Sequence, residues 1–220
     1  MYRACIFDLD GTLTDTLESL TFSVNETLRT FSLPGITHEQ CRSFVGSGAK
    51  VLMERALRAV GDESLSRLEE AMKVYGRIFQ EYCTYDVTPY DGIENMLQVL
   101  QNRGMKLAVL SNKPHKQAVD VVTSVFGENL FSLVQGQMEA VPKKPDPTAV
   151  YAIVDALGVP KEECLYVGDS DIDMQTGQAA GMDTVGVTWG FRSKEVLREN
   201  GATYLVDQPG ELIAIVEEKE

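Results

Sequence analysis

The stretch FDLDGTLTD, residues 7–15, decides how the rest of this sequence is interpreted. It begins at the end of the apolar run Arg3 to Phe7, which has the length and composition of a buried strand. Asp8 therefore lies at the carboxyl end of a strand, and Asp10 follows two residues later. Ligands of open parallel sheets bind at that edge. The motif therefore predicts that the first strand of the chain ends at a binding site.

The two carboxylates of this motif repel each other unless a cation or a shared proton offsets their charge. Hard oxygen ligands of this kind suit Mg²⁺. Gly11 permits a tight backbone path, and the Thr12 hydroxyl can hold a neighbouring carboxylate. Taken alone, the stretch is also compatible with an ordinary acidic turn, because Asp and Gly are common in turns.

Short apolar runs recur along the chain and predict a sheet. They cover residues 3–7, 106–110, 130–134, 164–167 and 184–187. Helical patterns lie between the later runs, at about 92–103, 114–126, 146–157 and 172–180. Strands that alternate with helices indicate a parallel sheet, and runs that are apolar throughout fit a sheet covered on both faces. The expected fold class is α/β.

Residues 15–85 interrupt this alternation, because they contain helix signatures in succession and no convincing strand. Asp15 with Glu18, and Thr37 with Gln40, have the spacing of a capping box at a helix start. Two apolar stripes with helical spacing follow these starts, and such stripes are typical of a packed helical core. The expected division is an α/β core made of residues 1–14 and 86–220, with a helical domain of residues 15–85 inserted into it.

The composition excludes several classes of protein. Hydrophobic residues make up 44% and charged residues 24% of the 220 residues, and no stretch is apolar for the ~20 residues of a membrane span. The net charge of −13, with no Lys/Arg cluster, argues against nucleic acid and anionic membranes as partners. The N-terminus has no leader-like pattern, so we expect a cytoplasmic protein.

The four cysteines include no C-x-x-C pair, so we expect small, reduced core residues. The charged end, residues 217–220, is expected to fray.

Polar residues also follow the second apolar run, in LAVLSNKP. This places Ser111 and Asn112 at the same edge of the sheet, where a hydroxyl and an amide could hold phosphate oxygens. The segment PKKPDP then offers Lys143 and Lys144, and a lysine fixed between prolines can bring a point charge to a phosphate. Ordinary turn chemistry and a solvated lysine pair are the alternatives if each segment is considered alone.

The fourth apolar run ends in YVGDSDIDMQ, which gives Asp169 at a strand end and Asp173 near a helix start. Carboxylates at a helix start can be simple caps. However, independent strand ends that converge on one edge supply carboxylates, a hydroxyl, an amide and an ammonium together. This combination matches phosphoryl transfer with a bound metal ion.

Four segments of the sequence together resemble a known family. The segments FDLDGTLTD, LSNK, KKPDP and GDSDID are similar, in order, to the signature motifs of the haloacid dehalogenase superfamily of phosphohydrolases. The resemblance implies a Rossmann-like core with a helical cap inserted after the first motif.

Carried over to this chain, the resemblance implies a role for each matching residue. Asp8 would attack phosphorus, and Asp10 would protonate the leaving group and later activate water. Ser111 and Lys144 would bind the transferring phosphoryl group, and Asn112 is a further candidate at the same place. The ligands of Mg²⁺ would be Asp8, Asp169 and the backbone carbonyl of Asp10, with Asp173 supporting the metal directly or through water.

The helical insert narrows the resemblance further. The segments SVNETLRTFSLPGIT and FVGSGAKVLMERAL, together with TPYDGI and GVTWGFR, are similar to those of phosphoglycolate phosphatases. We expect the glycine-rich turn to recognise the substrate, and its candidate residues are Gly46, Ser47, Gly48 and Lys50. A plain turn between helices, with Lys50 in solvent, is the alternative. The expected partner is a small phosphorylated metabolite, most readily 2-phosphoglycolate, and the chain is expected to be a monomer or a homodimer.

Other functions compete with this interpretation. A sugar phosphomutase of the same superfamily shares the core motifs, so only the insert favours a phosphatase. A phosphatase for another small organic phosphate also fits. A signalling receiver domain has no helical insert and no need for Asp10. A catalytically inactive binding protein is expected to lack one of the carboxylates, and a dehalogenase has no use for Asp10 or the metal-binding carboxylates.

Overall fold

A parallel sheet forms the centre of the protein, and a computed structural model describes residues 1–218 of it. Within these residues the strands lie in the order β5-β4-β1-β6-β7-β8, and each neighbouring pair is parallel. The strands are β1 (Ala4–Phe7), β4 (Lys106–Pro114), β5 (Leu133–Gln137), β6 (Cys164–Gly168), β7 (Asp183–Val187) and β8 (Tyr204–Val206). The predicted α/β class is confirmed.

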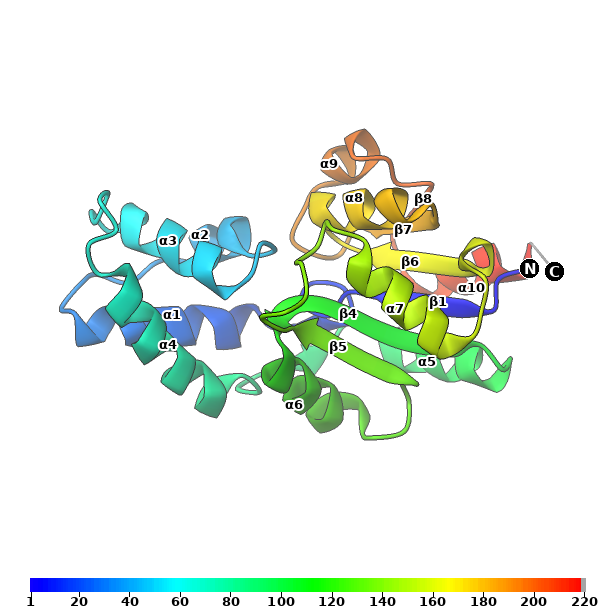
Figure 1. Cartoon of the computed structure of the whole chain (residues 1–220), viewed down its shortest axis with the longest axis horizontal. Coiled ribbons are helices and arrows are strands. Elements are labelled where there is room, and N and C mark those ends of the chain that lie inside the picture. The colour runs from blue at the N-terminus through cyan, green and yellow to red at the C-terminus, as the bar shows by residue number, and fades with distance from the viewer. Residues whose placement is uncertain (219–220) are drawn as a thin grey trace.

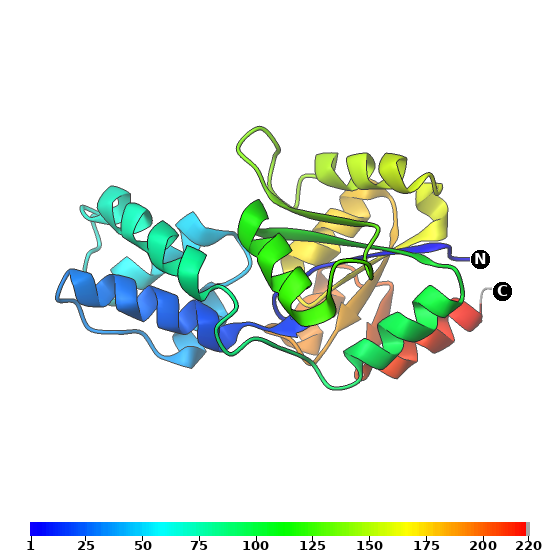
Figure 2. The same cartoon turned by 90° about the horizontal axis from the view of Figure 1, so that it is seen from below.

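Helices cover both faces of this sheet (Figures 1 and 2). Alternate residues of β1 show why: Cys5 and Phe7 belong to one buried apolar cluster, and Ala4 and Ile6 belong to another. The first cluster includes side chains of α5 (Ile93–Asn102), α6 (His115–Phe126) and α10 (Pro209–Glu217). The second includes side chains of α7 (Thr148–Leu157) and of the end of α8 (Asp171–Ala180). The short α9 (Lys194–Glu199) contacts β7 and β8, and the 3-10 helix η1 (Lys161–Glu163) precedes β6.

The predicted strands all form, although their limits differ. The run expected at 130–134 becomes a strand only at Leu133, because Phe131 packs edge-on against Phe126 at the end of α6 instead. The run expected to end at Leu110 continues as β4 to Pro114. The short strand β8 was not predicted, since it has only three residues at the edge of the sheet, of which Tyr204 and Leu205 are half-buried, and carries no long apolar run.

The predicted insert forms a bundle of helices beside the carboxyl ends of the strands (Figure 1). Its helices are α1 (Leu17–Thr30), α2 (His38–Phe44), α3 (Ala49–Ala59) and α4 (Leu68–Tyr82). A short antiparallel ribbon, β2 (Thr14–Asp15) with β3 (Thr88–Pro89), joins the bundle to the sheet region. The domain limits 1–14, 15–85 and 86–220 remain a prediction, and this arrangement supports them.

One of the two predicted helix caps is confirmed. Thr37 and Gln40 form the expected capping box at the start of α2. The capping box predicted for Asp15 and Glu18 is wrong, because α1 begins one residue later than that pairing requires and Glu18 binds His38 at 2.7 Å. Asp15 instead accepts a hydrogen bond from the backbone N–H of Leu17.

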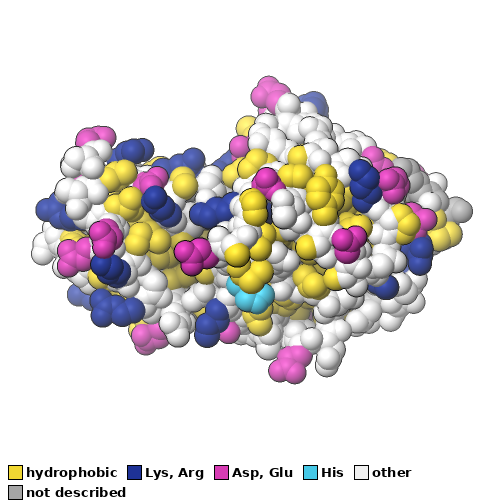
Figure 3. Space-filling view, viewed as in Figure 1, with side chains coloured by type: hydrophobic (Ala, Val, Ile, Leu, Met, Phe, Trp, Pro, Cys, Tyr) yellow, Lys and Arg dark blue, Asp and Glu magenta, His cyan; other side chains and the backbone are white. Residues whose placement is uncertain are grey.

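The structure also bears on the predictions about cysteines, membrane spans, surface charge and the chain end. All four cysteines are buried and none forms a disulfide. No helix within residues 1–218 is long and apolar enough to cross a membrane. Acidic and basic side chains are interspersed on the face shown in Figure 3, without a single basic patch. Of the tail predicted to fray, Glu217 ends α10, and residues 219–220 lie outside the described part of the chain.

Candidate active site

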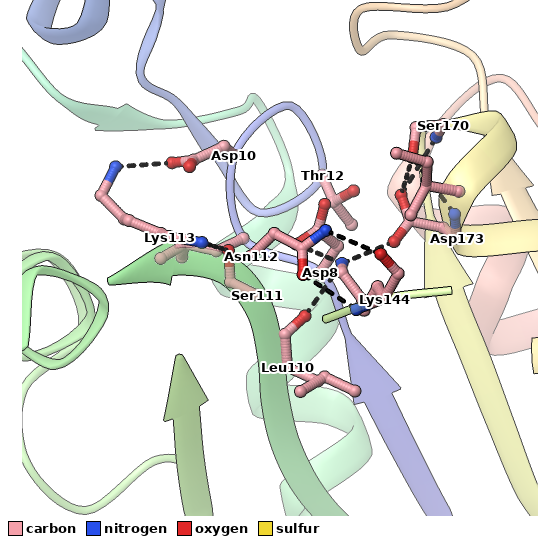
Figure 4. Close-up of polar contacts among 12 residues, drawn as sticks. Asp8, Asp10, Thr12, Leu110, Ser111, Asn112, Lys113, Lys144, Ser170 and Asp173 are labelled. Atoms are coloured by element: carbon pink, nitrogen blue, oxygen red, sulfur yellow. Dashed lines mark hydrogen bonds and ion pairs between the residues drawn. The ribbon is translucent and has the colours of Figure 1, made fainter. Parts of the chain in front are cut away.

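Polar side chains from neighbouring strands meet at the carboxyl edge of the sheet (Figure 4). Because β1 pairs with both β4 and β6, the residues that follow these three strands must come together. Asp8 follows β1, Asp169 follows β6, and Ser111 lies near the end of β4. Lys144 reaches them from the segment between β5 and α7. The predicted convergence of strand ends is therefore present in the fold.

A buried lysine links two of the carboxylates. The Lys144 ammonium lies 2.9 Å from Oδ1 of Asp8 and donates a 2.7 Å hydrogen bond to Oδ1 of Asp173. It also donates to the backbone carbonyl of Leu110. The Lys144 side chain is only 2% exposed, so its charge is stable there only because carboxylates face it. Although burial alone lowers the pKa of Lys144, Asp173 and Asp8 outweigh it and hold that pKa well above its usual value.

The Asp173 carboxylate is engaged on both oxygens. Its Oδ2 accepts hydrogen bonds from the backbone N–H and the hydroxyl of Ser170, at 3.1 and 2.5 Å, and completes a capping box at the start of α8. Its Oδ1 accepts from Lys144. Gly168 is required beside it, because a Cβ there would lie 2.3 Å from the Asp173 side chain. Asp173 is therefore both a helix cap and the anchor of Lys144.

The Asp169 carboxylate is fixed by two donors. Its Oδ1 accepts a 3.0 Å hydrogen bond from the Thr12 hydroxyl, as the sequence suggested, and its Oδ2 accepts a 2.7 Å bond from the backbone N–H of Phe191. Gly11 has a φ of +87°, and a Cβ at that position would lie 2.5 Å from Asp169 Oδ2, so both conformation and space demand glycine. The first motif thus holds a carboxylate that comes from a distant strand.

One buried lysine offsets only part of the charge of three buried carboxylates. Asp8, Asp169 and Asp173 are buried, and they offer oxygens that all lie within 4.8 Å of one another. Burial, followed by the charge of Asp173, raises the pKa of Asp8 well above its usual value, and Lys144 offsets only part of this rise. Burial and Asp173 also raise the pKa of Asp169, to about 7. A compact set of buried, hard oxygen donors fits a divalent cation such as Mg²⁺.

Asp8 has an oxygen that the protein leaves available. Its Oδ1 is buried and has no partner of hydrogen-bonding geometry, although the Lys144 ammonium is 2.9 Å away. The ion pair with Lys144 still offsets part of the charge of Asp8. Because this oxygen accepts no hydrogen bond from the protein, it can accept another partner, as a metal ligand must.

Asp10 is paired with a residue that the sequence did not single out. The Lys113 ammonium lies 2.9 Å from Oδ1 of Asp10, and the Lys113 side chain is only 1% exposed. Its ammonium also lies 4.9 Å from the ring centre of Phe79, on α4 of the helical bundle. The lysine was visible in LSNKP, but its partners come from distant parts of the chain. No local pattern could have assigned it to the site.

A bulge in β4 explains how Lys113 reaches the site. Between Leu110 and Pro114 the strand advances four residues while β5 advances two, so Ser111, Asn112 and Lys113 bulge out of the regular pairing. Bulges next to active sites redirect side chains in this way. Gly136 on β5 makes room for the bulge, because a Cβ there would lie 2.6 Å from the Lys113 carbonyl.

The structure separates the two residues predicted to bind phosphate at this strand end. The Ser111 hydroxyl oxygen accepts only a 3.2 Å bond from the backbone N–H of Lys113, which leaves its proton for a ligand. Asn112 also lines the cavity, but its side chain is bound to the backbone in this structure. Its amide donates to the carbonyls of Gly46 and Lys144 and accepts from the Lys144 N–H. The Asn112 side chain therefore ties three backbone segments together and is not available for phosphate in this conformation.

The glycine-rich turn of the insert contributes only part of what was predicted. Gly46 and Gly48 line the cavity, whereas Ser47 and Lys50 do not. The expectation that Lys50 points at a substrate requires correction: its side chain is 64% exposed and lies 3.9 Å from Glu54. Helix α3 begins at Ala49, and this turns Lys50 toward a separate groove beside Leu68 and Met72.

The cavity lies between the sheet edge and the helical bundle. About 560 Å³ of empty space lies among its lining residues, and this figure includes open solvent at its mouth. Its apolar walls are formed by Leu20, Val45, Ala49, Leu52, Phe79, Pro114 and Phe191. Its polar lining includes Asp8, Asp10, Ser111, Lys113, Asp169 and Arg192.

Arg192 is a further residue that sequence reasoning did not assign to the site. Its guanidinium donates to the backbone carbonyls of Arg42 and Val45, at 3.0 and 2.6 Å, and lies 3.5 Å from Asp171. Both carbonyls belong to the C-terminal end of α2, where backbone acceptors lack helical partners. Arg192 therefore connects the segment after β7 to the helical bundle. The segment GVTWGFR carried a family resemblance but no visible sign of this contact.

Comparison with known proteins agrees with this geometry. A family model described as haloacid dehalogenase-like hydrolase matches residues 5–187. A phosphoglycolate phosphatase of Colwellia psychrerythraea is 32% identical and covers 94% of both chains, and one of Haemophilus influenzae is 31% identical over 96% of both. The crystal structure of a predicted phosphoglycolate phosphatase from Haemophilus somnus matches with a TM-score of 0.90, 26% identity and 97% coverage of both chains. The chain therefore belongs to the haloacid dehalogenase-like hydrolase family and, within it, is a phosphatase.

Proposed function

We propose that the protein is a Mg²⁺-dependent phosphomonoester hydrolase that works through an aspartyl-phosphate on Asp8, and that its substrate is 2-phosphoglycolate. The observation that carries this proposal is the buried group of Asp8, Asp169 and Asp173, with Lys144 between two of its members. The names of the relatives support the choice of substrate.

In the first half of the reaction, an Asp8 oxygen attacks phosphorus and the bond from phosphorus to the leaving oxygen breaks. Asp10 gives its proton to that oxygen, which departs as an alcohol. The Lys144 ammonium and the Ser111 hydroxyl hold the phosphoryl oxygens, whose charge would otherwise repel the attacking carboxylate. One difficult displacement is thereby divided into two easier ones.

In the second half, Asp10 is ionised and takes a proton from water while that water attacks the phosphorus of the aspartyl-phosphate. The bond to Asp8 breaks, inorganic phosphate forms, and the Asp8 carboxylate is restored. Asp10 holds the proton that the next substrate needs, so one residue serves as acid and then as base. Lys113, at 2.9 Å, keeps Asp10 in place during both halves.

Mg²⁺, when bound, would neutralise charge on the phosphoryl oxygens and on the carboxylates around them. We assign its protein ligands to Asp8, Asp169 and the backbone carbonyl of Asp10. Asp173 acts mainly by holding Lys144, because hydrogen bonds already engage both of its oxygens.

We further propose that residues 15–85 act as a cap that closes the cavity against water. The walls from this segment are apolar, as in Leu20, Leu52 and Phe79, and they leave room for only a small leaving group. Asn112 and Arg192 hold the closed arrangement through the backbone of the turn at Gly46 and of the end of α2.

The proposal is tested by phosphate release from a panel of small phosphomonoesters and sugar phosphates, with and without a chelator. We expect 2-phosphoglycolate to be the best substrate, activity to vanish with excess chelator, and Mg²⁺ to restore it. Ca²⁺ should bind but support little turnover, because its looser coordination misplaces the attacking oxygen. Full activity in excess chelator, or dependence on a sugar bisphosphate, would contradict the proposal.

A further inference from the structure

We propose that Lys113 recognises the carboxylate of the substrate, and so selects 2-phosphoglycolate over phosphomonoesters whose leaving group carries no charge. This inference rests on the proposed function, because it assigns a specificity residue to the same reaction. It replaces the sequence-based expectation that Lys50 has this task.

The first argument is the position of the Lys113 ammonium. It lines the cavity while its side chain is only 1% exposed, so its charge faces the cavity interior rather than bulk water. An ammonium has three donors, and within residues 1–218 the Lys113 ammonium donates one hydrogen bond, to Asp10. The ring of Phe79, 4.9 Å away, stabilises the cation but accepts no conventional hydrogen bond. The ammonium therefore has donor capacity for an anionic ligand.

The second argument is the chemistry of Asp10. To protonate the leaving oxygen, Asp10 must lie within hydrogen-bond reach of it. In 2-phosphoglycolate a single methylene group separates that oxygen from the carboxylate. A lysine 2.9 Å from Asp10 is therefore beside the part of the substrate that carries the second negative charge.

The third argument is that the other nearby cations are committed elsewhere. Lys144 is engaged with Asp8, Asp173 and a backbone carbonyl on the phosphoryl side. Among the described residues that line the cavity, Lys113 and Arg192 are the cations, and Arg192 is bound to two carbonyls of the helical bundle. Lys50 points away from the cavity. Arg192 keeps unused donors, but its side chain is 18% exposed and its charge is also paired with Asp171. The Lys113 side chain is 1% exposed and lies beside Asp10, so Lys113 is the cation best placed for a ligand inside the cavity.

The fourth argument concerns closure. Lys113 belongs to the sheet region, whereas Phe79 belongs to the helical bundle, so their contact exists only when the two meet. The carboxylate is then recognised in a site sheltered from water, where a charge-assisted hydrogen bond discriminates more strongly than it does on the surface.

The test compares 2-phosphoglycolate with ethylene glycol monophosphate, in which a hydroxymethyl group replaces the carboxylate. We expect Lys113→Met to reduce the ratio of kcat/KM values, phosphoglycolate over ethylene glycol monophosphate, by about 10-fold or more. Both substrates lose some activity, since Asp10 loses its partner, but only the ratio reports carboxylate recognition. Lys113→Arg should keep most of the ratio, and the matched control Lys50→Met should keep all of it.

Inhibition by the product supplies a second measurement. Glycolate should inhibit the wild-type enzyme, and this inhibition should weaken by about 10-fold or more in Lys113→Met. If Lys113→Met fails to fold, Lys113→Gln retains a polar group beside Asp10 without the charge and gives the same test.

The outcomes separate this inference from the proposed function. A wild-type enzyme that prefers phosphoglycolate, combined with Lys113 variants that retain the preference, overturns the role of Lys113 and leaves the proposed function standing. A wild-type enzyme with no preference between the two esters overturns the proposed substrate itself. A loss of preference in Lys50→Met equal to that in Lys113→Met also contradicts the assignment.

Discussion

Replacing Asp173 with alanine tests how the buried charges are held in place. The carboxylate is fully buried and accepts from Lys144 at 2.7 Å and from two groups of Ser170. Loss of a buried charge-assisted hydrogen bond costs about 1.5–3 kcal/mol, and loss of a helix cap costs about 1 kcal/mol. In metal-free protein, Asp173 also repels Asp8 and Asp169, whose pKa values it raises. Removing Asp173 relieves this repulsion, which offsets part of the lost unfolding free energy. We therefore expect Asp173→Ala to lose about 2–3 kcal/mol of unfolding free energy.

The assay is urea denaturation and thermal melting of metal-free protein, with Asp171→Ala as the matched control. A loss of this size lowers the Tm of a chain this long by roughly 5–10 °C. Asp171 begins the same helix, but its side chain is 38% exposed and lies 3.5 Å from Arg192, so its loss should cost less than about 1 kcal/mol. Equal losses in the two variants, or less than about 1 kcal/mol in Asp173→Ala, would refute the reasoning.

Three further predictions concern the metal, the cap and the bulge. Because the pKa of Asp169 is raised to about 7 and that of Asp8 is also raised, protons compete with Mg²⁺ at low pH. Titration calorimetry should therefore show Mg²⁺ affinity falling by about 10-fold per pH unit below 7, and a pH-independent affinity would contradict this. Arg192→Ala should raise KM and speed proteolysis between α2 and α3, because two bonds to the helical bundle are lost; unchanged values would refute its closing role. Gly136→Ala should lower both Tm and kcat/KM, since its Cβ would lie 2.6 Å from the Lys113 carbonyl. Gly76→Ala, which meets no atom within 4 Å, should lower neither.

The placement of Asp8 and Asp169 could be predicted because it follows from local patterns and a topological rule. Each residue ends an apolar run, and parallel strands direct their carboxyl ends to one edge. The structure places these ends on paired strands, β1 and β6. The Thr12 hydroxyl could be predicted to bind a carboxylate, but not which one, because its partner Asp169 follows a distant strand.

The roles of Asn112, Lys113 and Lys50 could not be predicted in this way. The bulge of β4, where the pairing with β5 shifts by two residues, decides where Asn112 and Lys113 point. The pattern of apolar residues in a strand does not reveal such a shift. The aromatic partner of Lys113 lies on another part of the chain, at Phe79. The direction of Lys50 depends on the start of α3 and on how that helix packs against α4. These features are set by tertiary packing.

The central claim is that Asp8 carries the phosphoryl group, and chemical trapping tests it most directly. Asp10→Asn should slow the second half of the reaction, because water then lacks its base. Because this variant also lacks the acid for an alcohol leaving group, it is mixed with p-nitrophenyl phosphate, whose leaving group needs no proton, and Mg²⁺. Rapid quenching, borohydride reduction and peptide mass spectrometry should then show Asp8 converted to homoserine. The same treatment of a variant that also carries Asp8→Asn should leave every aspartate unmodified. An adduct on another residue, or phosphate release by Asp8→Asn above about 1% of the wild-type rate, would contradict the account.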